Sequence, residues 1–223
     1  MPESAEWEKS LRSLFSSAGT ADYIGEEVSI VQHSLQAAYL ALTNGAERLA
    51  EQFAANSGCA RLQGMLEGRT AESEECSKEE FIAACLLHDV GHMLGIEGRL
   101  PQMDGWGTED HEGVGARWAG SLGFTLAVCD LIHNHVNAKR YLCYVHPVYQ
   151  ANLTTASQET LVRQGGPMNE EEATEWEKSP RFLHYLAIRR VDEKAKVPNM
   201  EVPDLSAYLS TLQSCMNSTH TIA

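Results

Sequence analysis

The segment CLLHDVGHML, from Cys85 to Leu94, places a histidine and an aspartate side by side within an apolar stretch. A lone buried histidine is most often a hydrogen-bonded core residue, but this chain has further imidazole and carboxylate groups that can join the pair. They are His33, His88, Asp89, His92, His111, His133, His135 and Asp192. These groups bind iron, manganese, zinc or cobalt, and without a thiolate motif they favour a nitrogen and oxygen site. The set predicts a metal centre.

Asp89 is suited to bridge two metal ions, because its carboxylate has two oxygens and His88 can bind one of the ions. The alternative is a buried ion pair between these neighbours. Adjacent side chains on a helix point about 100° apart, so such a pair would have no common partner. We therefore favour metal binding. His133 faces away from His135 and is expected at the surface or outside the ligand set, and His146, His184 and His220 lie outside the pattern.

Several helices must carry these ligands inward, as in carboxylate-bridged diiron bundles. Apolar residues recur every three to four positions from Val28 to Leu42, which predicts a helix that ends at Asn44-Gly45. Gly91 and Gly95 are expected to loosen the end of the helix that carries Asp89, and Thr108 or Asp110 to cap the next one. Further helices are expected near 46–55, 81–89, 111–121, 124–138, 155–163, 169–177, 180–196 and 204–214.

Strand patterns are nearly absent, so the predicted fold class is all-α. A chain of 223 residues with 43% hydrophobic residues is long enough to bury one sizeable core. We expect a single domain over residues 1–223. The polar, acidic and turn-rich stretch around residues 58–78 is expected to be an exposed insertion between helices.

The net charge of -14 opposes binding to nucleic acid or to an anionic membrane surface, which favours a small-molecule partner. No apolar run approaches the roughly 18 residues of a membrane span, and the N-terminus lacks the apolar core of a secretory signal. The cysteines form no CxxC pair, so reduced thiols and a cytoplasmic location are expected, with Cys85 and Cys129 buried. The oligomeric state is left open.

The order of the ligands resembles the H...HD...D signature of the HD-domain superfamily, which comprises metal-dependent phosphohydrolases and their oxygenase relatives. His33, the His88-Asp89 pair and the distant Asp192 carry this likeness. His111 and His135 resemble the additional ligands of the diiron subset. The resemblance implies an HD-domain helical bundle with two iron ions bridged by Asp89. One iron would be bound by His33, His88, Asp89 and Asp192, and the other by Asp89, His111 and His135.

The likeness extends from Tyr23 to about Lys196 and includes GTEDHEGVGARW, AKRYL, QGGPM and RRVDEKAK. Over this range the chain resembles mixed-valent diiron oxygenases that oxidatively cleave the carbon-phosphorus bond of 1-hydroxyphosphonates and are relatives of myo-inositol oxygenase. The resemblance implies an Fe(II)/Fe(III) pair and O2 as co-substrate. It also implies a small 1-hydroxyphosphonate substrate, such as the 2-amino or 2-trimethylammonio compound, converted to a carboxylic acid and phosphate. The gap between His33 and His88 is longer than we expect in this family.

The same resemblance implies roles outside the ligand set. Tyr23 would occupy an iron site at rest and move away as substrate arrives. Glu26 would hold this gate and can meet a substrate ammonium group. The alternative for both residues is an ordinary helix start, where acidic residues favour the helix dipole.

Two cations are expected to hold the phosphonate. Lys139 lies one helical turn after a ligand and Arg189 nearly one turn before another. Their alternative is a pair of solvated surface cations. Ser157 and His92 would donate hydrogen bonds to phosphonate oxygens, although Ser157 could instead cap a helix. The aromatic residues Trp106, Trp118 and Tyr141 are expected in the core rather than at the substrate.

Three functions remain open from the sequence. The oxygenase is favoured because the additional histidines and the Tyr23/Glu26 pair have no role in a plain hydrolase. An HD-type metal-dependent phosphohydrolase acting on a phosphate monoester or nucleotide would use the same ligands with a metal-activated water and no O2. A degenerate HD protein that only binds a regulator is disfavoured, since buried ionisable clusters are costly to keep without a metal.

Overall fold

The computed structural model describes residues 6–23, 25–69 and 75–217. Across these residues it contains helices and three isolated β-bridges but no strand, which confirms the all-α prediction. The α-helices are α1 Glu6–Ser17, α2 Ile30–Asn44, α3 Ala46–Ser57, α4 Ala60–Leu66, α5 Lys78–Leu87, α6 Val90–Gly98, α7 His111–Ser121, α8 Leu126–Val145, α9 Pro147–Ala151, α10 Thr155–Arg163, α11 Glu170–Trp176, α12 Phe182–Lys194 and α13 Leu209–Ser214, with 3-10 turns η1 Ala18–Thr20 and η3 Leu205–Tyr208.

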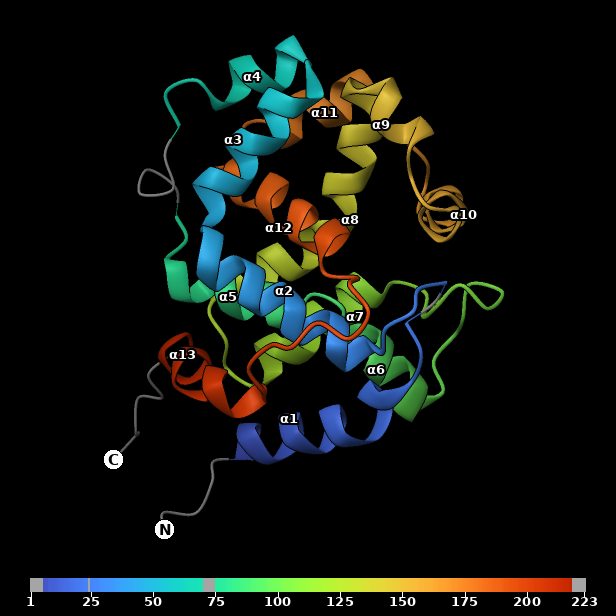
Figure 1. Cartoon of the computed structure of the whole chain (residues 1–223), viewed down its shortest axis with the longest axis vertical. Coiled ribbons are helices and arrows are strands. Elements are labelled where there is room, and N and C mark those ends of the chain that lie inside the picture. The colour runs from blue at the N-terminus through green and yellow to red at the C-terminus, as the bar shows by residue number, and fades with distance from the viewer. Residues whose placement is uncertain (1–5, 24, 70–74, 218–223) are drawn as a thin grey trace.

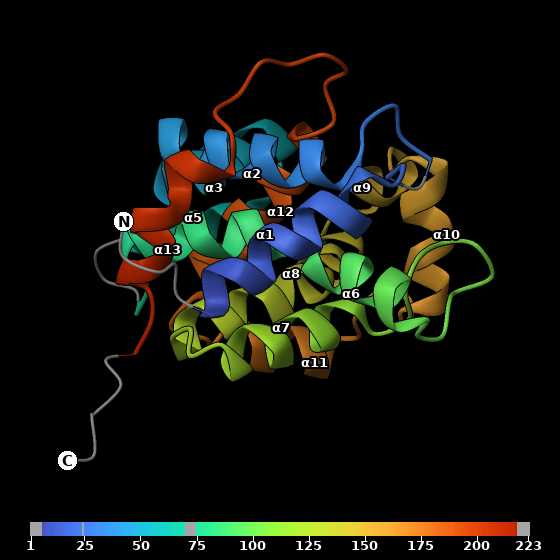
Figure 2. The ribbon, with the colours of Figure 1, turned by 90° about the horizontal axis from the view of Figure 1, so that it is seen from below.

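Helices α2, α5, α8 and α12 form the centre of the bundle (Figure 1). Helix α7 packs along α8 and against α6, α3 packs along α12, and α1 crosses one side of the molecule beside α6 (Figure 2). The small residues Ala37, Ala38 and Ala41 on α2 are fully buried, which allows α2 to approach α5 closely. The metal-ligand candidates therefore lie where the long helices converge.

The starts of α2 and α5 are fixed by their own sequence. Ser29 and Gln32 form a capping box at the start of α2, and Ser77 and Glu80 form another at the start of α5. Helix α2 ends at Asn44 and is followed by Gly45, whose φ of 75° is a conformation that favours glycine. These local signals explain why the α2 boundaries were predictable to within two residues.

The expected helix through Asp89 is interrupted at that residue. Helix α5 ends at Leu87 and α6 begins at Val90, while Asp89 adopts φ -102° and ψ 10°. Gly91 and Gly95 do not loosen a helix end, contrary to the prediction, because both lie inside α6. A Cβ atom on Gly91 would lie 1.9 Å from the carbonyl oxygen of His111. Gly91 therefore allows α6 to contact the backbone of His111, and Gly95 allows it to contact the side chain of Thr108.

Several other boundaries differ from the prediction. The polar insertion contains the short helix α4, and its residues 70–74 lie outside the described part of the chain. Helices α1 and α9 were not predicted, and α8 continues to Val145 because its last turns are buried against the bundle. Asp110 precedes α7 with a φ of 51° and its side chain makes no cap hydrogen bond, so the predicted side-chain cap is absent.

The described helices include none that is long and apolar enough to cross a membrane. All six cysteines are free thiols. Cys85 is buried as predicted, whereas Cys129 is only half-buried.

Candidate metal centre

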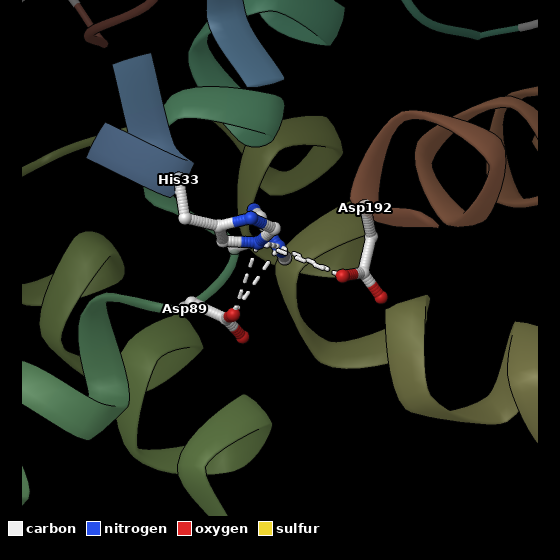
Figure 3. Close-up of side chains that lie close together, drawn as sticks. His33, Asp89 and Asp192 are labelled. Carbon is white, nitrogen blue, oxygen red and sulfur yellow. Dashed lines mark hydrogen bonds and ion pairs between the residues drawn. The ribbon is translucent and has the colours of Figure 1, made fainter. Parts of the chain in front are cut away.

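Four side chains from three parts of the bundle converge in the first ligand group, which comprises His33, His88, Asp89 and Asp192. Three of them are labelled in Figure 3, where the side chains of Asp89 and Asp192 both point toward the His33 ring. The Nε2 atom of His33 lies 3.4 Å from Oδ2 of Asp89 and 3.5 Å from Oδ1 of Asp192. The Nε2 atoms of His33 and His88 are 3.0 Å apart. All four residues are buried.

The second ligand group shares Asp89 with the first. The Oδ1 atom of Asp89 lies 3.5 Å from Nε2 of His111 and 3.4 Å from Nε2 of His135. The two imidazole nitrogens are 3.0 Å apart. The two oxygens of Asp89 thus face different groups, which is the geometry required of a carboxylate that bridges two ions.

The helix break at Asp89 explains how neighbours in sequence meet at one point. The Nε2 atom of His88 lies 3.4 Å from Oδ2 of Asp89. On a continuous helix their side chains would diverge by about 100°. Because α5 ends before His88 and α6 begins after Asp89, the aspartate leaves the helical path and turns its carboxylate toward the histidine.

Backbone carbonyl groups orient three of the imidazole rings. Nδ1 of His33 donates to the Ala195 carbonyl at 2.8 Å, and Nδ1 of His88 donates to the Cys85 carbonyl at 2.8 Å. Nδ1 of His135 donates to the Ile132 carbonyl at 2.7 Å. Since a carbonyl only accepts, each Nδ1 carries the hydrogen and each Nε2 is left to face the group. Metal-binding histidines are typically held in this way.

These groups fit metal ions. Burial lowers the pKa of His88 to about 4, so its Nε2 carries a lone pair at neutral pH, pointing at the nitrogen of His33. A positive ion is needed between such groups. Oδ2 of Asp89 and Oδ1 of Asp192 are also buried in this place and accept no hydrogen bond from the described residues. One proton could not serve four ligand atoms, whereas a single metal ion can bind all four.

The electrostatics of the site agree with a cation-binding role. Burial alone would raise the pKa of Asp89, but the surrounding histidines, led by His88, hold it well below its usual value. Burial would likewise raise the pKa of Asp192, yet the positive charges of Arg189 and Lys196 lower it. Both carboxylates are therefore ionised at neutral pH and ready to bind metal.

A cavity of about 60 Å³ opens beside the two ligand groups. It brings together every substrate-contact candidate from the sequence. His133, which was expected outside the ligand set, is exposed and does not line the cavity. Besides the ligands Asp89, His111, His135 and Asp192, its lining comprises Tyr23, Glu26, His92, Trp106, Val136, Lys139, Ala156, Ser157, Thr160, Gln164, Arg189 and Lys196. Trp106 lines this cavity, contrary to the expectation of a core position. Tyr141 is in the core as expected, where its hydroxyl donates to Glu177.

Lys139 and Arg189 are not solvated surface cations, because their exposed fractions are only 5% and 4%. Nζ of Lys139 donates to Oγ1 of Thr160 at 2.9 Å. Burial, together with the nearby charge of Arg189, lowers the pKa of Lys139 to about 7. Arg189 donates to Asp192 and, at 2.7 Å, to the hydroxyl of Tyr149.

His92 and Ser157 offer hydrogen-bond donors to the cavity. Nδ1 of His92 accepts from the backbone N–H of Thr108 at 3.0 Å, so the hydrogen of the neutral ring lies on Nε2. The His92 ring stacks on His111 with a centroid distance of 3.9 Å. Ser157 does not cap α10, because Thr154 holds that position and accepts from the Ser157 backbone N–H. The Ser157 hydroxyl is therefore not used as a helix cap.

Tyr23 lies directly against the first ligand group. Its ring stacks on His33 with a centroid distance of 4.2 Å, and burial and the charge of Asp89 raise its pKa well above the usual value. Oε1 of Glu26 lies 3.2 Å from Nζ of Lys196. Sequence reasoning did not identify Lys196, although the residue lies one helical turn after Asp192 within the segment RRVDEKAK. The four-residue spacing from Asp192 could have identified Lys196 as a residue near the site.

Comparison with known proteins assigns the family. Residues 30–174 match the HD domain. The chain is 35% identical over 202 residues to the 1-hydroxy-2-(trimethylamino)ethyl phosphonate dioxygenase (glycine-betaine-forming) of Leisingera caerulea, which covers 90% of this chain and 85% of the relative. It is 35% identical over 209 residues to the hydroxymethylphosphonate dioxygenase of Gimesia maris, covering 93% and 87%.

A third relative, the uncharacterized protein L432 of Acanthamoeba polyphaga mimivirus, is 31% identical over 196 residues, covering 88% of this chain and 75% of the relative. The chain belongs to the HD-domain family. Its similarity to two phosphonate dioxygenases confirms the resemblance inferred from the sequence.

Proposed function

We propose that this HD-domain oxygenase oxidatively cleaves the carbon-phosphorus bond of a small 1-hydroxyphosphonate and releases a carboxylic acid and phosphate. The observation that carries the proposal is the shared carboxylate of Asp89, which faces two groups of histidines beside a cavity with buried cations. Two relatives that are named as phosphonate dioxygenases support the same chemistry.

The proposed cofactor is a mixed-valent Fe(II)/Fe(III) pair. His33, His88, Asp89 and Asp192 would hold one iron, and Asp89, His111 and His135 the other. When bound, the iron pair supplies the redox couple through which O2 oxidises the substrate. Zinc accepts similar ligands but has no redox chemistry.

The side chains of the cavity would bind and orient the substrate. A phosphonate is doubly charged near neutral pH and would be repelled by the carboxylates of the site. Lys139 places a positive charge against it, and Arg189 supports this from its buried position beside Asp192. His92 and Ser157 would donate hydrogen bonds to the remaining phosphonate oxygens, and Trp106 would exclude water from the substrate. Tyr23, whose ring stacks on His33, would move away from the first ligand group as substrate arrives.

The proposed reaction balances without any further reductant. RCH(OH)PO3H2 and O2 give RCOOH and H3PO4. The carbon-phosphorus and carbon-hydrogen bonds of the substrate break, and each product gains one oxygen atom. The substrate carbon and phosphorus together lose the four electrons that O2 accepts.

The proposal is tested by measuring phosphate release from 1-hydroxyphosphonates and from p-nitrophenyl phosphate, in air and without O2. We expect phosphate only from a hydroxyphosphonate and only with O2, because a carbon-phosphorus bond offers no oxygen leaving group for hydrolysis. With ¹⁸O-labelled O2, mass spectrometry should find one labelled oxygen in each product. Equal release from p-nitrophenyl phosphate with and without O2 would instead support the HD-type phosphohydrolase.

A further inference from the structure

We infer that Lys196 is a specificity-determining residue that selects against cationic substrates, so that the preferred 1-hydroxyphosphonate carries no positive charge on its carbon chain. The inference rests on the proposed function and deepens it, because it concerns the far end of the same substrate. Nothing about the metal ligands or the phosphonate contacts distinguishes a neutral from a cationic substrate. The distinction depends on what Glu26 and Tyr23 already contact.

Lys196 forms an ion pair with the one carboxylate in the cavity lining that a substrate cation could use, that of Glu26. Among the described residues that line the cavity, Glu26 is the only carboxylate outside the two ligand groups. Its Oε1 atom lies 3.2 Å from Nζ of Lys196, and the two side chains are 16% and 14% exposed. A substrate ammonium group would need this counter-ion, but the chain's own ammonium group already neutralises it.

The ammonium group of Lys196 also lies over the aromatic ring of Tyr23. Its Nζ atom lies 5.3 Å from the centroid of the Tyr23 ring, within the range of a cation–π contact. The same ring stacks on His33 at 4.2 Å. Quaternary ammonium groups are usually recognised by such aromatic faces. The ammonium group of Lys196 therefore makes both contacts that would attract a cationic substrate.

The backbone on both sides of Lys196 is anchored to α2. The carbonyl of Ala195 accepts from Nδ1 of His33 at 2.8 Å. The N–H of Val197 donates to Oε1 of Gln36 at 3.0 Å, and its carbonyl accepts from Nε2 of Gln36 at 2.8 Å. These bonds fix the point from which the Lys196 side chain extends. Its position is thus preorganised rather than induced by substrate.

A cationic substrate would meet an unfavourable site. It would face the like charge of Lys196 in a cavity that already contains Lys139 and Arg189, and like-charge contacts suppress wrong partners. A neutral substrate such as hydroxymethylphosphonate suits this distribution of charge.

The experiment compares kcat/KM of the iron-loaded protein for two neutral substrates, hydroxymethylphosphonate and 1-hydroxyethylphosphonate, and two cationic ones, the 2-amino and 2-trimethylammonio 1-hydroxyethylphosphonates. We expect the wild-type protein to prefer the neutral substrates by about tenfold or more. A wild-type preference for either cationic substrate would overturn the inference. If no substrate released phosphate with O2, the proposed function itself would fail, and this inference with it.

The ratio of kcat/KM between the 2-amino and the 1-hydroxyethyl substrate then assigns the preference to Lys196. Lys196→Met removes the charge at similar size and should shift this ratio toward the cationic substrate by about tenfold, whereas Lys196→Arg should keep the wild-type ratio. Adding Glu26→Gln to Lys196→Met should abolish the shift. A variant that lowers both rates equally and leaves the ratio unchanged would show a purely structural role and refute the inference. Iron content is measured in each variant.

Discussion

Arg189 donates a hydrogen bond from Nη1 to Oδ2 of Asp192, whose other carboxylate oxygen faces the first ligand group. The arginine therefore supports a candidate metal ligand as well as the substrate cavity. Nζ of Lys139 donates instead to Thr160, and among the described residues it makes no hydrogen bond to a metal-ligand candidate. The sequence presented the two cations as equivalent, but Arg189 contacts a candidate metal ligand and Lys139 contacts a threonine of the cavity lining.

This difference predicts distinct variant phenotypes. Lys139→Met should keep its iron and lower kcat/KM for a 1-hydroxyphosphonate by about 10- to 100-fold, mainly through KM, because one charge-assisted contact is lost. Arg189→Met should lose iron as well, because Asp192 loses the partner that lowers its pKa. Steady-state kinetics and metal analysis measure both effects. Lys178→Met, on the surface, is the control. Retention of full iron by Arg189→Met would contradict this assignment.

The two ligand groups predict two iron ions per chain after iron loading, with an electron paramagnetic resonance signal from a coupled Fe(II)/Fe(III) pair on partial reduction. Asp89→Ala should lose both ions, because each of its oxygens faces one group. His135→Ala should lose mainly the ion of the second group. Metal analysis of the purified variants tests this. A full metal complement in Asp89→Ala, or a single zinc in the wild-type protein, would show the assignment to be wrong.

The metal-free protein should lose stability on mild acidification. Burial lowers the pKa of His88 to about 4 and lowers those of His92 and His111. These rings stay neutral in the fold, while the unfolded chain takes up protons below about pH 6.5, so stability falls as the pH falls from about 6.5 to about 4. His135 opposes this. Burial alone would lower its pKa, but a hydrogen bond with Asp89 raises it, so its contribution is present at low pH and lost as the pH rises through the folded pKa.

Acidification destabilises the fold through three of these histidines and stabilises it through one. We therefore expect a lower Tm for the metal-free protein at pH 5 than at pH 7, measured by circular dichroism. His88→Gln should reduce this pH dependence. The matched variant His133→Gln should leave it unchanged, because that side chain is exposed. An unchanged or higher Tm at pH 5 would argue against neutral buried histidines.

Gly91→Ala should destabilise the protein and weaken metal binding by the second ligand group. The added Cβ would lie 1.9 Å from the backbone oxygen of His111, and such overpacking costs about 1–3 kcal/mol. Gly64→Ala is the control, since no atom of the described residues lies within 4 Å of its added Cβ and alanine is favoured within helix α4. Thermal unfolding and iron analysis compare the two. Equal stability of both variants would refute the close packing of α6 on His111.

The helices and the ligand candidates could be predicted because their signals are local. The capping serine of α2, the glycine that ends it and the spacing of its apolar residues all lie within one segment. The helix break at Asp89 was missed because CLLHDVGHML is continuously apolar around the pair. The pairing of Glu26 with Lys196 was also missed, because the two residues are far apart in sequence. The same holds for Trp106, whose loop reaches the cavity only in the folded chain.

The hydrogen bond between His33 and Ala195 joins residues that are 162 positions apart. Contacts of such long range form late, because the entropy of closing a large loop must first be overcome. During synthesis on the ribosome, His33 emerges long before the segment that contains Asp192 and Ala195. The first ligand group can therefore assemble only when nearly all of the described chain has been translated. A metal ion would then load onto an almost finished fold rather than nucleate its folding.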